Sequence, residues 1–119
     1  MRYFLGAVLC LITGVATKAT AAAAPIDPDT GFFNVTLGDY QAELANARAL
    51  HKQGVLLIFE RAGCSYCRQL RANVLSQPAV QAYYRAHFLI FPVDINGSIA
   101  VTDFQGRQRS ESQFARDDN

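Results

Sequence analysis

Two continuous apolar runs mark the centre of the predicted fold. Residues 55–59 read Val-Leu-Leu-Ile-Phe, which is typical of a strand buried on both faces of a sheet. Residues 88–93 have a similar composition, although Pro92 indicates an edge or a bend near the far end of this second strand. Strands of this kind need helices above and below the sheet, so we expect the rest of the chain to supply them.

Two of the predicted helices have clear sequence signals at their ends. The first extends from a cap at Asp39 to about residue 52, and Gly54 is expected to end it. The other covers residues 76–87, directly before the second strand, with Ser76 as its cap. Both carry apolar residues at helical spacing, which predicts that each buries one face.

A further helix is predicted between the two strands, at residues 65–75, where Cys67, Leu70 and Val74 share an apolar face. The resulting order of strand, helix, helix and strand fits a parallel pair joined by a helical crossover, so the predicted fold class is an α/β sheet. Near the end of the chain, Ser110 followed by Gln113 has the spacing of a capping box that opens a last helix.

The first 23 residues have the pattern of a secretory signal peptide. An apolar run at residues 5–16 is too short for an ordinary membrane-spanning helix, and three small residues at 21–23 fit the signal peptidase pattern. We therefore predict export and cleavage after Ala23, with Cys10 discarded in the removed segment. An uncleaved N-terminal anchor is the alternative interpretation.

The predicted mature chain consists of an N-terminal lead-in at residues 24–37 and one domain at residues 38–119. The lead-in is rich in Pro, Asp and Gly, which favours an exposed connection. The full chain has a net charge of +1, and loss of Arg2 and Lys18 leaves nine basic against ten acidic residues. No basic stripe is present, so nucleic acid is not an expected partner.

Cys64 and Cys67 are the only cysteines after the predicted cleavage, and they form a C-x-x-C motif between the first strand and a helix. A cysteine at a helix N-terminus is favoured as a thiolate, so Cys64 is the predicted nucleophile. Cys67 lies one turn later on the same face and can resolve a mixed disulfide. Positive charge from Arg61, Arg68 and Arg71 should further favour the thiolate.

Other uses of two cysteines fit the pattern less well. A static structural disulfide remains an alternative, but it would close so short a loop that it restrains little chain entropy. A zinc site would require two further ligands, and His51 and His87 lie apart on predicted helices. Covalent haem would require a histidine directly after Cys67, where Arg68 stands. We therefore expect no metal and no organic cofactor.

Four stretches of the chain resemble the SoxW-like periplasmic thioredoxins. They read Phe-Glu-Arg-Ala-Gly-Cys-Ser-Tyr-Cys at 59–67, Val-Leu-Ser-Gln-Pro at 74–78, Asp-Ile at 94–95 and Val-Thr-Asp-Phe-Gln-Gly at 101–106. The resemblance implies a thioredoxin-like fold and a periplasmic dithiol carrier associated with sulfur oxidation. Such a carrier receives electrons from a membrane thiol transporter and reduces oxidised cysteines of exported proteins.

The chain departs from classical thioredoxins near the motif. Those proteins carry a buried Asp where this chain has Ile58, so Glu60 is the nearest candidate for proton transfer to and from Cys67. A solvated residue at a strand end is the alternative interpretation of Glu60. Gly63 stands where classical thioredoxins have Trp before the first cysteine, so the surface that meets the substrate is expected to differ.

Thioredoxin-like folds continue beyond the last predicted helix into a strand with a cis-Pro, another strand and a terminal helix. The printed sequence holds no proline after Pro92, so we expect an incomplete thioredoxin-like fold in which one flank of the first strand is open. Two rival functions remain. One is a periplasmic oxidant or isomerase of the Dsb kind, because Tyr66 also occurs before the second cysteine there. The other is a redox-inert docking module.

Overall fold

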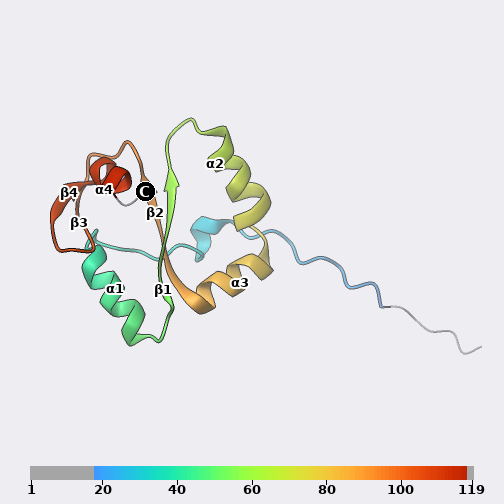
Figure 1. Ribbon diagram of the computed structural model, residues 1–119. Helices are drawn as coiled ribbons and strands as arrows, with labels where there is room; N and C mark the ends of the chain where they lie inside the picture. Colours follow the sequence, from blue (N-terminus) through green and yellow to red (C-terminus); the bar gives the residue numbers. More distant parts are fainter. Residues whose placement is uncertain (1–17, 118–119) are drawn as a thin grey trace, which may run out of the picture.

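Two parallel strands lie at the centre of the computed structural model in Figure 1, which describes residues 18–117. Strand β1 (Gly54–Glu60) pairs with β2 (Phe88–Asp94) in a register that runs from Gly54 opposite Phe88 to Glu60 opposite Asp94. The connection between them is helical, as the sequence predicts. It consists of α2 (Ser65–Leu70), a π-helical segment η2 (Arg71–Leu75) and α3 (Pro78–His87). The α/β fold class is therefore confirmed.

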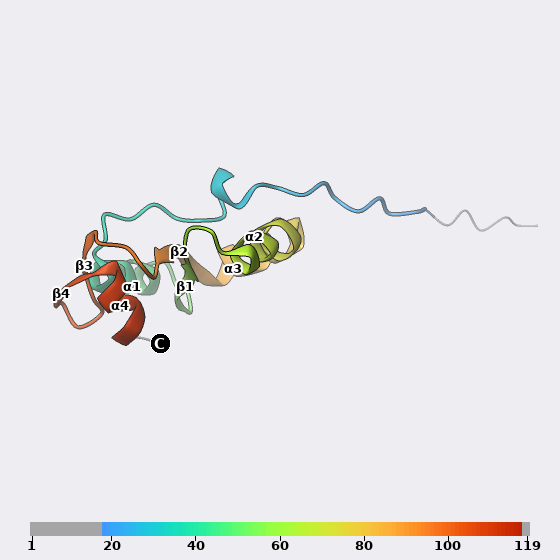
Figure 2. The ribbon, with the colours of Figure 1, turned by 90° about the horizontal axis from the view of Figure 1, so that it is seen from above.

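The remaining elements flank this pair. A short 3₁₀ turn, η1 (Pro28–Thr30), and helix α1 (Tyr40–Ala49) precede β1. After β2, an antiparallel hairpin of β3 (Ala100–Thr102) and β4 (Gln108–Ser110) leads into α4 (Glu111–Asp117). The sequence signals indicated turns in this region but not the hairpin. Helices α1 and α4 lie on one side of the central strands, and α2 and α3 lie on the other (Figures 1 and 2).

The pleat of the two strands divides the core into two clusters, because successive side chains point to opposite faces. Leu89, Phe91 and Val93 pack with α1, α4 and the hairpin, and the partly buried Val55, Leu57 and Phe59 join them. On the opposite face, Ile90 packs with Phe32 and Leu75. The expectation that both faces of the strands need cover is therefore confirmed.

Aromatic rings fill the larger of the two clusters. The rings of Tyr40 and Phe114 stack with centroids 4.6 Å apart, and Phe91 meets Tyr40 edge-on at 5.9 Å. Burial raises the pKa of Tyr40 to about 12, with the charges of Glu111 and Glu43 adding to the effect. Helix α4 is thereby fixed against α1 and β2. The predicted capping box opens it, since Ser110 Oγ accepts from the backbone N–H of Gln113 and the Gln113 side chain accepts from Ser110 N–H.

Buried Asp103 organises the hairpin. Its carboxylate accepts hydrogen bonds from the backbone N–H groups of Gln105 and Arg107 and from the guanidinium groups of Arg107 and Arg109, at 2.7–3.0 Å. Burial acts to raise the pKa of this carboxyl group, but the hydrogen bonds outweigh it and lower the pKa from 3.8 to about 2. The ladder between β3 and β4 is short, and the hydrogen bonds to Asp103 add to it in holding the hairpin together.

The predicted end of the first helix is wrong by three residues. The structure confirms Asp39 as the cap, because its carboxylate accepts from the N–H of Ala42 at 2.9 Å. The helix stops at Ala49, however, and His51 adopts the left-handed conformation with φ of 56°. The N–H groups of His51 and Lys52 bond to carbonyls of the preceding turn in a Schellman arrangement. Gly54 consequently begins β1 and does not cap the helix.

The helices between the strands also differ from prediction. Residues 65–75 do not form one α-helix, because α2 passes into the π-helical η2 at Arg71. Ser76 follows the end of η2 and is not the N-cap of α3. Its buried hydroxyl donates to the carbonyl of Ala72 at 2.5 Å, whereas Gln77 holds the cap position of α3. A serine hydroxyl can either accept from a backbone N–H as a helix cap or donate to a carbonyl of the preceding turn. Here the π turn places the Ala72 carbonyl within reach.

The lead-in packs more closely than its composition indicates. Most of residues 25–31 are exposed, as expected, but Phe32 is fully buried against the second face of the strands. Asn34 runs beside β2, where its N–H donates to the carbonyl of Ile90 and its side chain accepts from Ile90 N–H, both at 2.8 Å. The predicted signal peptide at residues 1–23 lies mostly outside the described residues.

Strand β1 is only half-buried along its whole length, whereas four residues of β2 are fully buried. Within residues 18–117, β1 has β2 as a partner on one side and no strand on the other. The open flank accounts for the residual exposure. No helix in this described part of the chain has the length and apolar character needed to cross a membrane.

Candidate functional site

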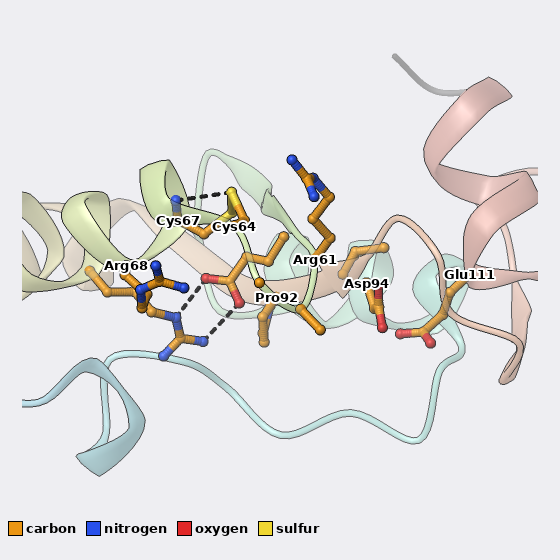
Figure 3. A pocket seen from close by; sticks show the side chains of 12 residues that line it. Arg61, Cys64, Cys67, Arg68, Pro92, Asp94 and Glu111 are labelled. Carbon is orange, nitrogen blue, oxygen red and sulfur yellow. Dashed lines mark hydrogen bonds and ion pairs between the residues drawn. A yellow bond between two sulfur atoms is a disulfide. The ribbon is translucent and has the colours of Figure 1, made fainter.

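Cys64 is the N-cap of α2, directly after the turn that follows β1. Its Sγ accepts a hydrogen bond from the backbone N–H of Cys67 at 3.1 Å (Figure 3). The two cysteines are joined by a disulfide, with their Cα atoms 5.3 Å apart. The predicted position of Cys64 at a helix N-terminus is therefore confirmed, and the structure corresponds to the oxidised state.

The turn before Cys64 explains why a glycine precedes the first cysteine. Gly63 has a φ of 71°, which is the left-handed region that disfavours residues with a side chain. A Cβ atom at this position would meet no neighbouring atom within 4 Å, so backbone conformation and not space is the constraint. This sharp turn delivers Cys64 from the end of β1 onto the first turn of α2.

An open cavity of about 540 Å³ lies beside the disulfide. One wall is formed by the end of β1, the following turn, α2 and the first residue of η2, and it includes both cysteines and three arginines. The opposite wall is formed by the end of β2, with Pro92 and Asp94, and by Glu111 at the start of α4. Residues from five elements therefore surround a partly exposed sulfur pair.

Comparison with known protein families agrees with this geometry. The family model described as a thioredoxin-like domain matches residues 40–118, well over half of the chain, and the matched region contains the whole C-x-x-C motif. The chain belongs to the thioredoxin-like family. No curated protein and no solved structure shows significant similarity to it. A strand, a sharp turn and a helix that starts at the first cysteine are consistent with a thiol–disulfide oxidoreductase.

In this thioredoxin-like protein, Glu60 lies at the end of β1 and lines the same cavity as the cysteines. Arg71 binds both of its carboxylate oxygens, since Nε donates to Oε1 at 2.7 Å and Nη2 donates to Oε2 at 2.8 Å. The side chain of Glu60 is 18% exposed, so it is neither fully solvated nor deeply buried. Its role in proton transfer stays a prediction.

Arg71 also fastens the lead-in to the site. Its Nη1 donates to Oδ1 of Asp29 at 2.9 Å, and its guanidinium lies 4.9 Å from the ring centroid of Phe33. The hydrogen bonds to Glu60 and the pairing with Asp29 raise the pKa of Arg71, although partial burial acts the other way. Two carboxylates thus pair with this arginine, one from β1 and one from the lead-in, and together they more than balance its single positive charge.

All three arginines predicted near the motif line the cavity of the thioredoxin-like protein, but their charges are not equivalent. Arg61 and Arg68 are exposed, and in the described part of the chain neither pairs with a carboxylate. The positive charge that the sulfurs experience therefore comes chiefly from Arg61 and Arg68 and from the helix N-terminus.

Sequence reasoning missed the acidic wall of the cavity. Asp94 ends β2 directly opposite Glu60, and parallel strands bring their carboxyl ends to one edge, so this neighbour could have been inferred from the predicted pairing. Glu111 could not, because only the hairpin returns it to that edge. His51 and His87 do not line the cavity. The described residues hold no group of three side chains suited to bind a metal ion.

Proposed function

We propose that the protein is an exported thiol–disulfide oxidoreductase that reduces disulfides of other exported proteins. The observation that carries this proposal is the placement of Cys64. Its sulfur caps α2 and accepts the N–H of Cys67, and the pair borders an open cavity. A sulfur in this position is stabilised as a thiolate by the helix N-terminus, which is the form that attacks disulfides.

The exchange begins from the reduced dithiol. The Cys64 thiolate attacks one sulfur of the substrate disulfide, that bond breaks, and the departing substrate thiolate takes a proton from solvent. Cys67 then gives up its proton, and its sulfur attacks Sγ of Cys64. The mixed disulfide breaks and the second substrate thiolate is protonated. Two electrons pass from the cysteine pair to the substrate, which leaves the Cys64–Cys67 disulfide present in this structure.

Glu60 is our candidate for the group that accepts the proton of Cys67. It borders the same cavity, and each of its oxygens accepts one hydrogen bond from Arg71. Because a carboxylate oxygen has two acceptor sites, one site on each oxygen remains available for a thiol or a bridging water. Replacement of Glu60 by Gln should slow the resolution of mixed disulfides more than their formation, and quenched-flow analysis separates these two steps.

Substitution of each cysteine by serine tests the assignment of Cys64 as the nucleophile. The Cys67→Ser variant should accumulate mixed disulfides with partner proteins, because the attack on Cys64 that releases them is lost. The Cys64→Ser variant should accumulate few, and the double variant gives the background. Non-reducing gels of all three variants provide the measurement. Equal trapping by both single variants would show that Cys64 is not the dedicated nucleophile.

The direction of electron flow is decided by the reduction potential of the pair. A value near about −270 mV would support the proposed reductant, and a value near about −120 mV would assign the protein to oxidants of the Dsb kind. Failure of the pair to exchange with any disulfide would instead favour the redox-inert docking module. Equilibration with glutathione buffers of known composition gives this potential.

The cellular setting follows from the resemblance to the SoxW-like thioredoxins. We propose that the mature protein begins near Ala24 in the periplasm, receives electrons from a membrane thiol transporter and serves a sulfur-oxidation system. N-terminal sequencing of protein released by osmotic shock tests the location. Recovery in the membrane fraction with Met1 retained would overturn it and favour the uncleaved anchor.

A further inference from the structure

Charge is distributed unevenly around the cavity beside the disulfide. Arg61 and Arg68 both line it, both are exposed, and in the part of the chain that the structure describes neither contacts a carboxylate. Arg71 differs, because Glu60 and Asp29 compensate its charge. Two uncompensated guanidinium groups therefore remain on the wall that carries the sulfurs.

The acidic groups lie on the other wall. In Figure 3, Arg61 and Arg68 lie on either side of Cys64, whereas Asp94 and Glu111 lie farther away, toward α4. In the described residues, neither of these carboxylates forms an ion pair. The charge of the lining therefore changes sign across the cavity. It is positive beside the sulfurs and negative near Asp94 and Glu111.

We propose that the site selects disulfides in which an acidic side chain lies next to the substrate cysteine. This inference rests on the proposed function and adds the substrate class to it. The expected occupant is an extended peptide segment of an exported protein, whose Asp or Glu contacts Arg61 and Arg68 while its sulfur meets Cys64. The cavity of about 540 Å³ has the size of a small-ligand site and accommodates a short segment of chain.

The two walls together determine how such a segment lies. Arginine binds a carboxylate through two parallel hydrogen bonds, and this contact forms only if the acidic residue is beside the cysteine. An acidic residue several positions away would instead approach Asp94 and Glu111 and be repelled, whereas a basic residue there would be attracted. The position of the charged residues, and not the net charge of the substrate, is therefore the recognised feature.

Two peptides of identical composition test this feature, and each ratio of rates is divided by the ratio measured with dithiothreitol, because a charged neighbour also shifts the pKa of the peptide's own thiol. Each contains one cysteine and is supplied as its disulfide-linked homodimer, so both sulfurs have the same neighbours. The first peptide has Asp next to the cysteine and Lys several residues away, and the second has these two residues exchanged. A third peptide carries Gln at both positions. The rate constant for reduction of each by the reduced, full mature protein is measured under anaerobic conditions.

The Asp-adjacent peptide should react about tenfold faster than its Lys-adjacent isomer at low ionic strength. This ratio should fall toward one as the ionic strength rises to about 1 M, because exposed charges are then screened within a few ångströms. Since both rates come from the same protein, any effect of the arginines on the Cys64 thiolate cancels in the ratio.

Variants assign the preference to the two arginines. The double variant Arg61→Gln, Arg68→Gln should reduce the ratio to within about twofold, and Arg61→Glu with Arg68→Glu should invert it. Arg48→Gln is the matched control, because Arg48 is exposed on α1 and does not line the cavity, so the wild-type ratio should be kept. The rate with the Gln peptide verifies that each variant is folded and active.

The outcomes separate this inference from the proposed function. If the wild-type protein reduces the Gln peptide but treats the two isomers alike, the substrate class is wrong and the oxidoreductase stands. A preference that survives in both double variants would likewise overturn the role of Arg61 and Arg68. If none of the three peptides is reduced, the proposed function fails and the inference fails with it.

Discussion

The two faces of the β1–β2 pair present the same kinds of apolar residue, but they differ in how tightly they are packed. The face toward α1 and α4 is closed by a stack of aromatic rings, with Tyr40 and Phe114 at most 2% exposed. The face toward α2 and α3 has a smaller cluster around Ile90, and Leu70 and Val74 of the predicted apolar helix face remain 38% and 41% exposed. Packing is concentrated on one face, and the helix that carries the cysteines lies on the other.

The same division applies to the two clusters of carboxylate and arginine. Asp103 is fully buried in the hairpin that packs on the aromatic face and leads into α4, and its ion pairs hold this hairpin together. Glu60 and Arg71 are partly exposed beside the cysteines, where they connect β1, η2 and the lead-in. A buried cluster fixes one conformation, whereas a partly exposed one can also meet solvent and substrate. The site therefore lies on the less densely packed side of the fold.

The largest expected effect comes from Phe114→Ala on the aromatic face. Removal of a fully buried ring should lower the free energy of unfolding by about 3–5 kcal/mol. Leu70→Ala on the opposite face should cost less than about 1 kcal/mol, because the leucine is already 38% exposed. Urea denaturation of the oxidised protein measures both, and comparable losses would show that the two faces contribute equally to stability.

Acid should weaken the buried carboxylate cluster. The pKa of Asp103 in the folded protein is lowered to about 2, so its ionised form stabilises the fold fully above the ordinary pKa of 3.8. That contribution is lost as the pH falls from about 4 toward about 2. Asp103→Asn should be less stable than wild type at neutral pH, and the difference should shrink over this acid range. Melting curves from pH 2 to 7 test it, and a constant difference would contradict it.

A smaller effect is expected from Arg71→Gln on the site face. The change removes the donors to Glu60 and Asp29, and the unpaired Glu60 is mostly buried, so a loss of about 1–2 kcal/mol is expected. It should also release the lead-in, seen as faster proteolysis near residues 25–31. Arg48→Gln, which removes no ion pair in the described region, should change stability by less than about 0.5 kcal/mol. Unchanged proteolysis would show that buried Phe32 and the hydrogen bonds between Asn34 and Ile90 hold the lead-in without Arg71.

The local part of the fold was predictable from sequence. The apolar runs at residues 55–59 and 88–93 lie in β1 and β2, and the Ser110 and Gln113 spacing opens α4. Cys64 is at a helix N-terminus because Gly63 and the run before it determine a strand, a turn and a helix in succession. Each of these signals lies within a few residues of the structure it predicts, so no distant contact is needed to interpret it.

Details that depend on competing local hydrogen bonds were predicted less well. The left-handed residue after α1 is His51 and not a glycine, because a Schellman arrangement satisfies the last carbonyls of the helix before Gly54 is reached. The helix after Cys67 changes to π-helical geometry at Arg71, which periodicity over so few residues cannot detect. In both places the local sequence is compatible with more than one set of backbone hydrogen bonds, and the surrounding structure selects one.

The sequence by itself determined the two central strands, the crossover order, the C-x-x-C motif and the helix N-terminus that carries Cys64. Only the tertiary structure decided what surrounds the sulfurs. It brings Asp29 from the lead-in to Arg71, places Glu111 across the cavity, and leaves Arg61 and Arg68 without an acidic partner in the described residues. Backbone preferences act over a few residues and are encoded locally, whereas the charge balance of a cavity depends on which distant segments the core brings together.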